Sequence, residues 1–247
     1  VFILGSLWGS FCNVCIYRLP KKENIVSDRS KCRSCKKKIN WYDNIPLISY
    51  LVLKGNCRCG KIKIDFRYFL VELVTALGFL SIFYLYGITI TTLLLIILTI
   101  FFVIIFFIDL DHFIIPNELT FPLMIIGFLK SFDPNINLSL FPNYLDSLIG
   151  GVFGYILIWG IITLYLKIRK KEGMGLGDAK LLAAIGFWFG WYSIPYVIFL
   201  SSLSALLIAL PSLINKSKSL SSQIPFGPYL IFGTVAYLVV RNYLTFI

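Results

Sequence analysis

The chain has 247 residues, of which 58% are hydrophobic, 17% aromatic and only 14% charged, and its mean hydropathy is +0.83. Soluble domains carry roughly 25% charged residues, so the composition excludes a soluble protein and predicts one embedded in a membrane. The 23 lysines and arginines outnumber the 12 acids, giving a formal net charge of +11. In a membrane protein such an excess marks the side on which the basic loops lie, so we expect no nucleic-acid partner.

Uncharged stretches predict an all-α polytopic membrane protein with about eight transmembrane helices. Residues 73–108 form an uncharged run of 36 residues. As one helix the run would be about 54 Å long against a hydrocarbon core of about 30 Å, so we expect it to fold back at Gly87. A second long run, 181–215, is expected to break around 190–195. The predicted spans lie near 1–17, 68–86, 89–108, 114–131, 144–166, 179–192 and 226–246, with an eighth in the part of the second run that follows its break. The stretch 179–192 is short for a crossing, so it is either a weak span or a re-entrant segment.

The basic residues predict the orientation. Segment 18–67 holds fourteen lysines and arginines against four acids, and an outside N-terminus puts 21 of the 23 basic residues on one side. Because basic loops face the cytoplasm, we expect a first transmembrane helix (1–17), a cytoplasmic loop domain (18–67) and a seven-helix membrane core (68–247). The basic residues follow the first apolar run, so we expect no cleaved signal peptide. Anionic headgroups of membrane lipids are the expected counterpart of the loop's charge.

The loop domain contains two closely spaced cysteine pairs, Cys32 with Cys35 and Cys57 with Cys59. Cytoplasmic thiols stay reduced, and two such pairs in a small polar loop predict a structural zinc site with four cysteine ligands. The second pair is C-x-C, one residue shorter than the usual spacing, so a degenerate site without metal stays open. Cys12 and Cys15 lie in the first helix, where we expect them to be buried as small apolar residues.

Two acids stand at predicted membrane edges. Asp109 ends the third span, and Asp178 closes Gly175-Leu-Gly177-Asp178 at the start of the sixth. Charge is costly there, which makes both residues functional candidates. Two neighbouring carboxylates that share a proton can serve as general base and general acid on a peptide bond, and glycines allow close approach of backbone or substrate. Spacing alone fits helix capping equally well. Asp111 is either an auxiliary carboxylate or a solvated one.

Ordered motifs run through nearly the whole chain. They are Gly9-Ser10-Phe11, Ile16-Tyr17-Arg18-Leu19-Pro20, Trp41-Tyr42-Asp43-Asn44-Ile45-Pro46, Glu72-Leu73, Asp109 to Pro116-Asn117, Gly173-Met174-Gly175-Leu176-Gly177-Asp178 and Pro225-Phe226-Gly227-Pro228. Together they resemble the type IV prepilin peptidases, membrane aspartic proteases with a GxGD motif.

The resemblance implies removal of the basic leader from type IV prepilins or pseudopilins at the cytoplasmic face of a bacterial inner membrane. It maps the catalytic pair onto Asp109 and Asp178, with Asp111 as the alternative first carboxylate and with Gly175 and Gly177 supporting the site. Many members with a cytoplasmic cysteine loop also methylate the new N-terminal amine with S-adenosylmethionine, so the resemblance implies a bifunctional enzyme. The short Cys57–Cys59 spacing departs from the family's pattern and bears on the metal geometry.

Three other classes of function remain open at this stage. A metal-dependent transferase would use Asp109 and Asp111 as a D-x-D metal site. A membrane adaptor would use the zinc loop to bind a partner or nucleic acid. A transporter would need polar residues near the middle of the membrane, whereas the acids here lie at the ends of the predicted spans.

Overall fold

The computed structural model describes residues 1–25, 40–58, 63–133, 140–170, 175–214 and 224–245. Within these ranges the chain forms nine α-helices and three short 3-10 helices, and its only strand-like pairing is an isolated bridge between Asn56 and Lys63. The chain divides into two compact units, residues 1–104 and 105–247, with the boundary inside helix α4. The division into 1–17, 18–67 and 68–247 was drawn from charge and hydropathy, and it stays a prediction.

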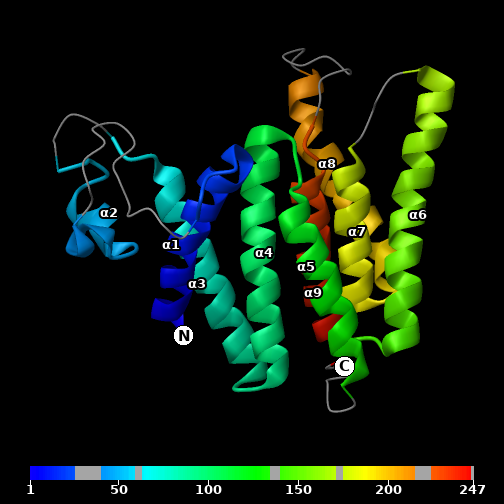
Figure 1. Ribbon diagram of the computed structural model, residues 1–247, viewed down its shortest axis with the longest axis horizontal. Helices are drawn as coiled ribbons and strands as arrows, with labels where there is room; N and C mark the ends of the chain where they lie inside the picture. Colours follow the sequence, from blue (N-terminus) through cyan, green and yellow to red (C-terminus); the bar gives the residue numbers. More distant parts are fainter. Residues whose placement is uncertain (26–39, 59–62, 134–139, 171–174, 215–223, 246–247) are drawn as a thin grey trace. The chain divides into compact units, whose positions relative to one another are not determined.

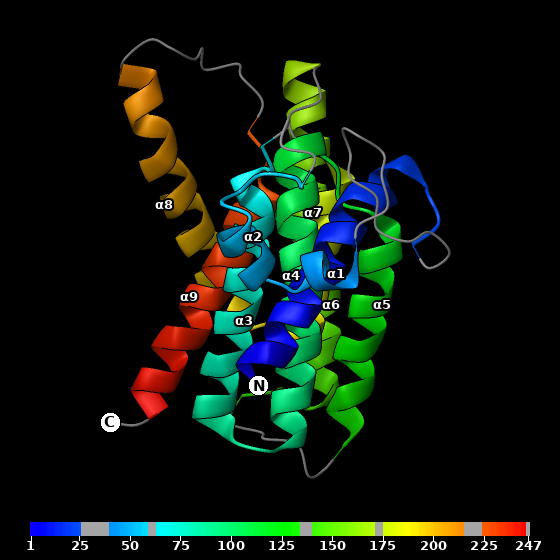
Figure 2. The same ribbon diagram turned by 90° about the vertical axis from the view of Figure 1, so that its left-hand side faces the viewer.

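The first unit contains α1 (Phe2–Arg18), α2 (Ile48–Val52), α3 (Phe66–Tyr86) and the first turns of α4 (Ile90–His112). Helices α1 and α3 pack side by side, as Figures 1 and 2 show. Cys12 and Cys15 are buried in α1, with 0% and 4% of their surface exposed, which confirms the expectation for these two thiols. Helix α3 ends at Tyr86, and the next residue, Gly87, has a φ of +60° that is strained for residues with a side chain, so the predicted turn is also confirmed.

The second unit contains the last turns of α4 together with α5 (Asn117–Leu129), α6 (Tyr144–Arg169), α7 (Leu176–Phe189), α8 (Ser193–Ile214) and α9 (Gly227–Thr245). Helix α7 is its centre, because it packs against α5, α6, α8 and α9, and Figure 1 shows it between α5 and α6. Ten of its fourteen residues are buried. The second predicted break is confirmed, since α7 ends at Phe189 and α8 begins at Ser193.

Small residues bring α7 close to its neighbours. A Cβ built on Gly150 of α6 would lie 2.5 Å from the carbonyl oxygen of Gly186 in α7, so the two backbones are in direct contact. Small residues at helix–helix contacts are a common way of packing membrane helices. On another face of α7, the indole Nε1 of Trp188 donates to the carbonyl of Leu123 in α5 at 2.8 Å. The position of α7 is therefore fixed by backbone contact on one side and a buried hydrogen bond on another.

Five helices of the described residues are long and apolar enough to cross a membrane, namely 2–21, 66–86, 90–112, 144–169 and 193–210. Each of the eight predicted spans coincides with a helix, but α5 and α7 have only 13 and 14 residues. A helix of that length spans about 20 Å, short of a hydrocarbon core of about 30 Å. The chain is thus an all-helical protein with several candidate membrane spans, and the count of eight crossings is not confirmed.

Candidate functional site

Asp109 lies in the last turns of α4, and only 4% of its surface is exposed. Its Oδ2 accepts a hydrogen bond of 3.0 Å from the backbone N–H of Gly227, a residue 118 positions further along the chain. Burying a carboxylate is costly unless a donor compensates the lost water. Gly227 is the first residue of α9, where the helix dipole favours a negative charge. The start of α9 therefore holds the Asp109 carboxylate in place.

The absence of a side chain at Gly227 makes this contact possible. A Cβ built on Gly227 would lie 2.7 Å from Oδ2 of Asp109, closer than carbon and oxygen atoms approach without displacement. The motif Pro225-Phe226-Gly227-Pro228 was one of the family motifs, yet its residue pattern assigned no role to Gly227. The donor in this contact is a backbone N–H, a group that every residue except proline carries, so the residue type at position 227 does not predict the hydrogen bond.

Asp178 is the third residue of α7 and is 8% exposed. Its backbone N–H donates to the carbonyl of Gly175, the N-cap residue, at 3.2 Å, so it sits in the first turn as the sequence predicted. It lies close enough to Asp109 for the charge of one carboxylate to act on the other. Two acids that are 69 positions apart in the sequence thus become electrostatic neighbours, both buried and both in the second unit.

Ile115, in the segment between α4 and α5, packs against both glycine-containing segments. A Cβ on Gly177 would lie 3.0 Å from Cβ of Ile115, and a Cβ on Gly227 would lie 3.1 Å from its Cδ1. At Gly175 the nearest described atom to a Cβ would be the nitrogen of Gly177, at 3.8 Å. The two glycines expected to support the site therefore differ, since a Cβ would be crowded by Ile115 at Gly177 but would make only an ordinary contact with the described residues at Gly175. Ile115 carries no chemistry and was not singled out from the sequence.

Asp111 is exposed, two residues beyond the buried Asp109. Successive residues in a helix are turned by about 100°, so side chains two positions apart point to different sides. A D-x-D metal site would need both carboxylates on one ion, and this geometry separates them. Among the described residues, no group of three or more His, Cys, Asp or Glu is arranged to hold a metal ion. The transferase alternative gains no support, and a supporting role for Asp111 stays a prediction.

Lys180 connects the start of α7 to the start of α5. Its Nζ donates to Oδ1 of Asn117 at 2.7 Å and lies 5.5 Å from the centre of the Phe121 ring. Asn117 is the first residue of α5, and Lys180 follows Asp178 by two residues. This bond holds the first turn of α7, and with it the backbone of Asp178, against α5.

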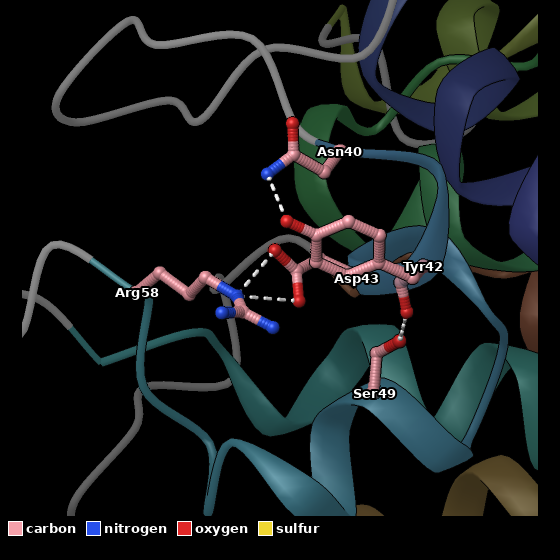
Figure 3. A network of polar contacts seen from close by, with 5 residues as sticks. All are labelled: Asn40, Tyr42, Asp43, Ser49 and Arg58. Carbon is pink, nitrogen blue, oxygen red and sulfur yellow. Dashed lines mark hydrogen bonds and ion pairs between the residues drawn. The ribbon is translucent and has the colours of Figure 1, made fainter.

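A second polar network lies in the loop of the first unit (Figure 3). Nε of Arg58 donates to Oδ1 of Asp43 at 2.8 Å, and the guanidinium lies 4.8 Å from the centre of the Tyr42 ring. The Tyr42 hydroxyl accepts from Nδ2 of Asn40 at 2.7 Å, and its carbonyl accepts from the Ser49 hydroxyl at 3.1 Å. The hydrogen bond to Asp43 raises the pKa of Arg58 above its ordinary value. Arg58, which stands between the second pair of cysteines, is therefore anchored to the segment 40–49.

Of the four predicted zinc ligands, the described residues contain only Cys57; Cys32, Cys35 and Cys59 lie outside them. Near Cys57 two described segments pair, because the N–H of Ile64 donates to the carbonyl of Gly55 at 2.6 Å and Asn56 forms a bridge with Lys63. The zinc site stays a prediction.

Two family models match the chain. One, described as the bacterial peptidase A24 N-terminal domain, matches residues 3–86, and the other, described as the type IV leader peptidase family, matches residues 96–210. A Pseudomonas aeruginosa protein named prepilin leader peptidase/N-methyltransferase is 37% identical over 99% of this chain and 92% of its own length. Proteins of the same name from Aeromonas hydrophila (37% identical; 99% and 93% covered) and Neisseria gonorrhoeae (35%; 92% and 85%) match similarly. The chain belongs to the type IV leader peptidase family.

No solved structure matches the chain. The resemblance inferred from the sequence motifs is confirmed by the family models and the full-length relatives. The match to the type IV leader peptidase family contains both Asp109 and Asp178 but ends at residue 210, ahead of Gly227. The match to the N-terminal domain covers α1, the cysteine loop and α3.

Proposed function

We propose that this chain is a membrane aspartic endopeptidase that removes the leader of type IV prepilins or pseudopilins and then methylates the new N-terminus. The observation that carries the peptidase proposal is the pair of buried, electrostatically coupled carboxylates of Asp109 and Asp178. Full-length relatives that bear the names of both activities support the combined function.

The carboxylate pair has the properties that peptide hydrolysis needs. Two neighbouring buried carboxyl groups do not both ionise, so one keeps a proton. The ionised group takes a proton from water as the water oxygen attacks the scissile carbonyl, and the protonated group donates to the carbonyl oxygen. Collapse of the tetrahedral intermediate breaks the C–N bond and passes a proton to the leaving amine. Because the N–H of Gly227 occupies Oδ2 of Asp109, Oδ1 is the oxygen left for water or substrate.

Methylation is the second reaction in this proposal. The amine that cleavage releases, once deprotonated, would attack a methyl carbon as the bond from that carbon to sulfur breaks; S-adenosylhomocysteine would leave, and the resulting N-methylammonium would lose a proton. S-adenosylmethionine supplies the methyl group for this step. We assign the reaction to the first unit, because the leader peptidase match contains the carboxylate pair and the separate N-terminal match covers α1, the cysteine loop and α3.

For the topology we propose eight crossings, with an outside N-terminus and with the cysteine loop and carboxylate pair at the cytoplasmic face of a bacterial inner membrane. The distribution of 21 of 23 basic residues supports this orientation. Lys167 and Arg169 end α6, and Asp178 lies in the first turn of the next helix. A prepilin with a basic leader and a membrane-embedded helix would present its scissile bond at that edge, while lipid headgroups balance the loop's charge.

We also propose that Cys32, Cys35, Cys57 and Cys59 hold a structural zinc ion. Four thiolates suit tetrahedral zinc, and the ion would stabilise a loop that has little apolar core of its own. The hydrogen bond between Gly55 and Ile64 and the anchored Arg58 support the proposal, because they hold the backbone on both sides of Cys57.

The peptidase proposal predicts that Asp109→Asn and Asp178→Asn each lower prepilin cleavage by at least about a hundredfold, the usual scale of general acid–base catalysis. Asparagine keeps the size of the side chain but cannot relay the proton. The measurement is the rate of leader removal from a co-reconstituted prepilin.

Glu118→Gln is the control, since it makes the corresponding change of an acid to its amide at an exposed position outside the carboxylate pair. We expect its cleavage rate to stay within about twofold of the parent rate, as for most surface substitutions. Undiminished cleavage by Asp109→Asn or by Asp178→Asn would rule out the carboxylate pair.

A further inference from the structure

Glu72 is a buried acid that lies outside the carboxylate pair. It belongs to α3, which is one of the candidate membrane spans, and only 9% of its surface is exposed. A charged group at such a position is costly and needs specific partners. Glu72 lies in the first unit, whereas Asp109 and Asp178 lie in the second, and the peptidase chemistry proposed above does not use it.

The partners of Glu72 come from α1 and from the loop. The backbone N–H of Leu47 donates to its Oε2 at 2.8 Å, and the side chain of Ser10 in α1 also hydrogen bonds to the carboxylate. The helices are close here, since a Cβ on Gly9 would lie 2.6 Å from Cα of Glu72. The carboxylate therefore sits at the contact between α1 and α3 and holds the loop through a main-chain bond.

Leu47 is the N-cap residue of α2 and has an unusual backbone conformation. Its φ is +62°, a region that L-residues with branched side chains rarely occupy. Such a conformation persists only where the surroundings hold it. The hydrogen bond to Glu72 is made by the N–H of this same residue, so the carboxylate stabilises this conformation directly.

The network in Figure 3 extends this attachment through the loop. Ser49, two residues beyond Leu47, bonds to Tyr42, and the neighbouring Asp43 forms the ion pair with Arg58. Arg58 adjoins Cys57. One carboxylate on α3 thus anchors a connected segment, residues 40–58, that reaches the second cysteine pair.

We propose that Glu72 is a positioning residue for the methylation reaction, holding residues 40–58 on the α1–α3 pair without contributing to peptide cleavage. The proposal rests on the N-methylation proposed above. Methyl transfer needs the amine nitrogen, the methyl carbon and the leaving sulfur in line at close range, and misplacement by about 1 Å can cost about a hundredfold. A loop released from α3 would lose that alignment, whereas Asp109 and Asp178 would keep theirs.

The test compares Glu72→Leu with Glu72→Gln. Glutamine retains an oxygen that accepts from Leu47 N–H, and leucine does not. Mass spectrometry of a co-expressed prepilin reports the cleaved fraction and the methylated share of the cleaved product. We expect Glu72→Leu to lower methylation at least about tenfold with cleavage within about twofold, and Glu72→Gln to restore methylation. Glu23→Leu, at an exposed glutamate of the same loop, is the control.

Trypsin cleavage at Lys54 and Arg58 in membranes gives a second readout that does not require methylation. Proteolysis of a folded loop follows the population of its open form. Trypsin should therefore cut Glu72→Leu at least about tenfold faster than it cuts the parent, Glu23→Leu or Glu72→Gln. This factor is the size expected for loss of a charge-assisted hydrogen bond. If the parent cleaves prepilin but never methylates it, the N-methylation proposal fails, while trypsin still decides whether Glu72 holds the loop.

Three results would overturn the proposal. The first is unchanged methylation and unchanged trypsin sensitivity in Glu72→Leu. The second is a Glu72→Gln variant as defective as Glu72→Leu, which would show that the charge itself acts. The third is a parallel loss of cleavage and methylation in protein present at normal levels in the membrane.

Discussion

At the scale of single residues, the carboxylate pair depends on a backbone group as much as on side chains. Asp109 and Asp178 could be predicted from the sequence, because acids are rare in this chain and costly at a membrane edge. Gly227 and Ile115 could not, since a backbone N–H and an apolar contact give no signal in residue type. The donor to Asp109 comes from a residue 118 positions away, a separation that hydropathy and spacing do not bridge.

Gly227 gives the first prediction at this scale. In Gly227→Ala the new Cβ would stand 2.7 Å from Oδ2 of Asp109, so either the carboxylate or the start of α9 must move. We expect prepilin cleavage to fall at least about tenfold, since catalytic groups need placement within about 0.5 Å. The loss should appear in kcat more than in KM, because the substrate's distant contacts are unchanged.

Gly160→Ala in α6 is the matched control, because a Cβ there meets nothing within 4 Å. Steady-state kinetics of both variants on the same prepilin provide the comparison. Equal rates for the two would mean that the Gly227 contact is not needed for cleavage.

At the scale of elements, the turns were predictable and the surroundings of each helix were not. The uncharged run 73–108 is too long for one span, and Gly87 is its only glycine between residues 79 and 108, so folding back there followed from length. The central position of α7 did not follow, because hydropathy does not distinguish contact with lipid from contact with other helices. Helix α7 packs against four other helices, yet its 14 residues have the same composition as a weak membrane span.

Gly186 tests the packing of α7 on α6. In Gly186→Ala the Cβ would overlap the carbonyl of Gly150, so the two helices must separate. Overpacking of this kind destabilises by about 1–3 kcal/mol, which corresponds to a fall of at least about 2 °C in the unfolding midpoint for a chain of this size.

The midpoint is measured by thermal unfolding of the purified protein in one detergent, again against Gly160→Ala. Alanine favours helix over glycine by about 1 kcal/mol, so the control midpoint should be unchanged or higher. A Gly186→Ala midpoint equal to that of the control would contradict close backbone packing between α6 and α7.

At the scale of the whole molecule, the sequence composition predicted a membrane protein, and the apolar stretches along the chain predicted the order of its helices. It did not predict two compact units with their boundary inside α4, because the spacing of apolar runs does not say which helices pack together. The pairs α1 with α3 and α8 with α9 pack together, and glycines lie at both contacts. The two family matches, 3–86 and 96–210, fall almost entirely on separate units, which favours separable activities.

Loss of zinc should therefore lower methylation and leave leader cleavage intact. In the double variant Cys32→Ser and Cys35→Ser we expect bound zinc to fall at least about tenfold, as for the loss of metal ligands or their supports. Methylation should fall with the zinc content, while leader cleavage continues. Metal analysis of the purified protein, run beside the mass-spectrometric assay, checks all three quantities.

Cys12→Ala is the control, because it removes a buried thiol of α1 that the proposed site does not use. It should retain the parent's metal content. A double variant with unchanged zinc would contradict the site, and one that loses cleavage would contradict the separation of the two activities.

The burial of α7 has a consequence for how the protein meets different bilayers. From Asp178 to Phe189, all but two residues of this helix are buried by protein, so α7 has almost no hydrophobic length to match to the surrounding lipid. When a bilayer becomes thicker or thinner, the helices in contact with lipid adjust by changing their tilt. In this protein the helices in contact with lipid are the neighbours of α7. The depth of Asp178 is set by contacts with other helices, which keeps it nearly constant as lipid composition varies.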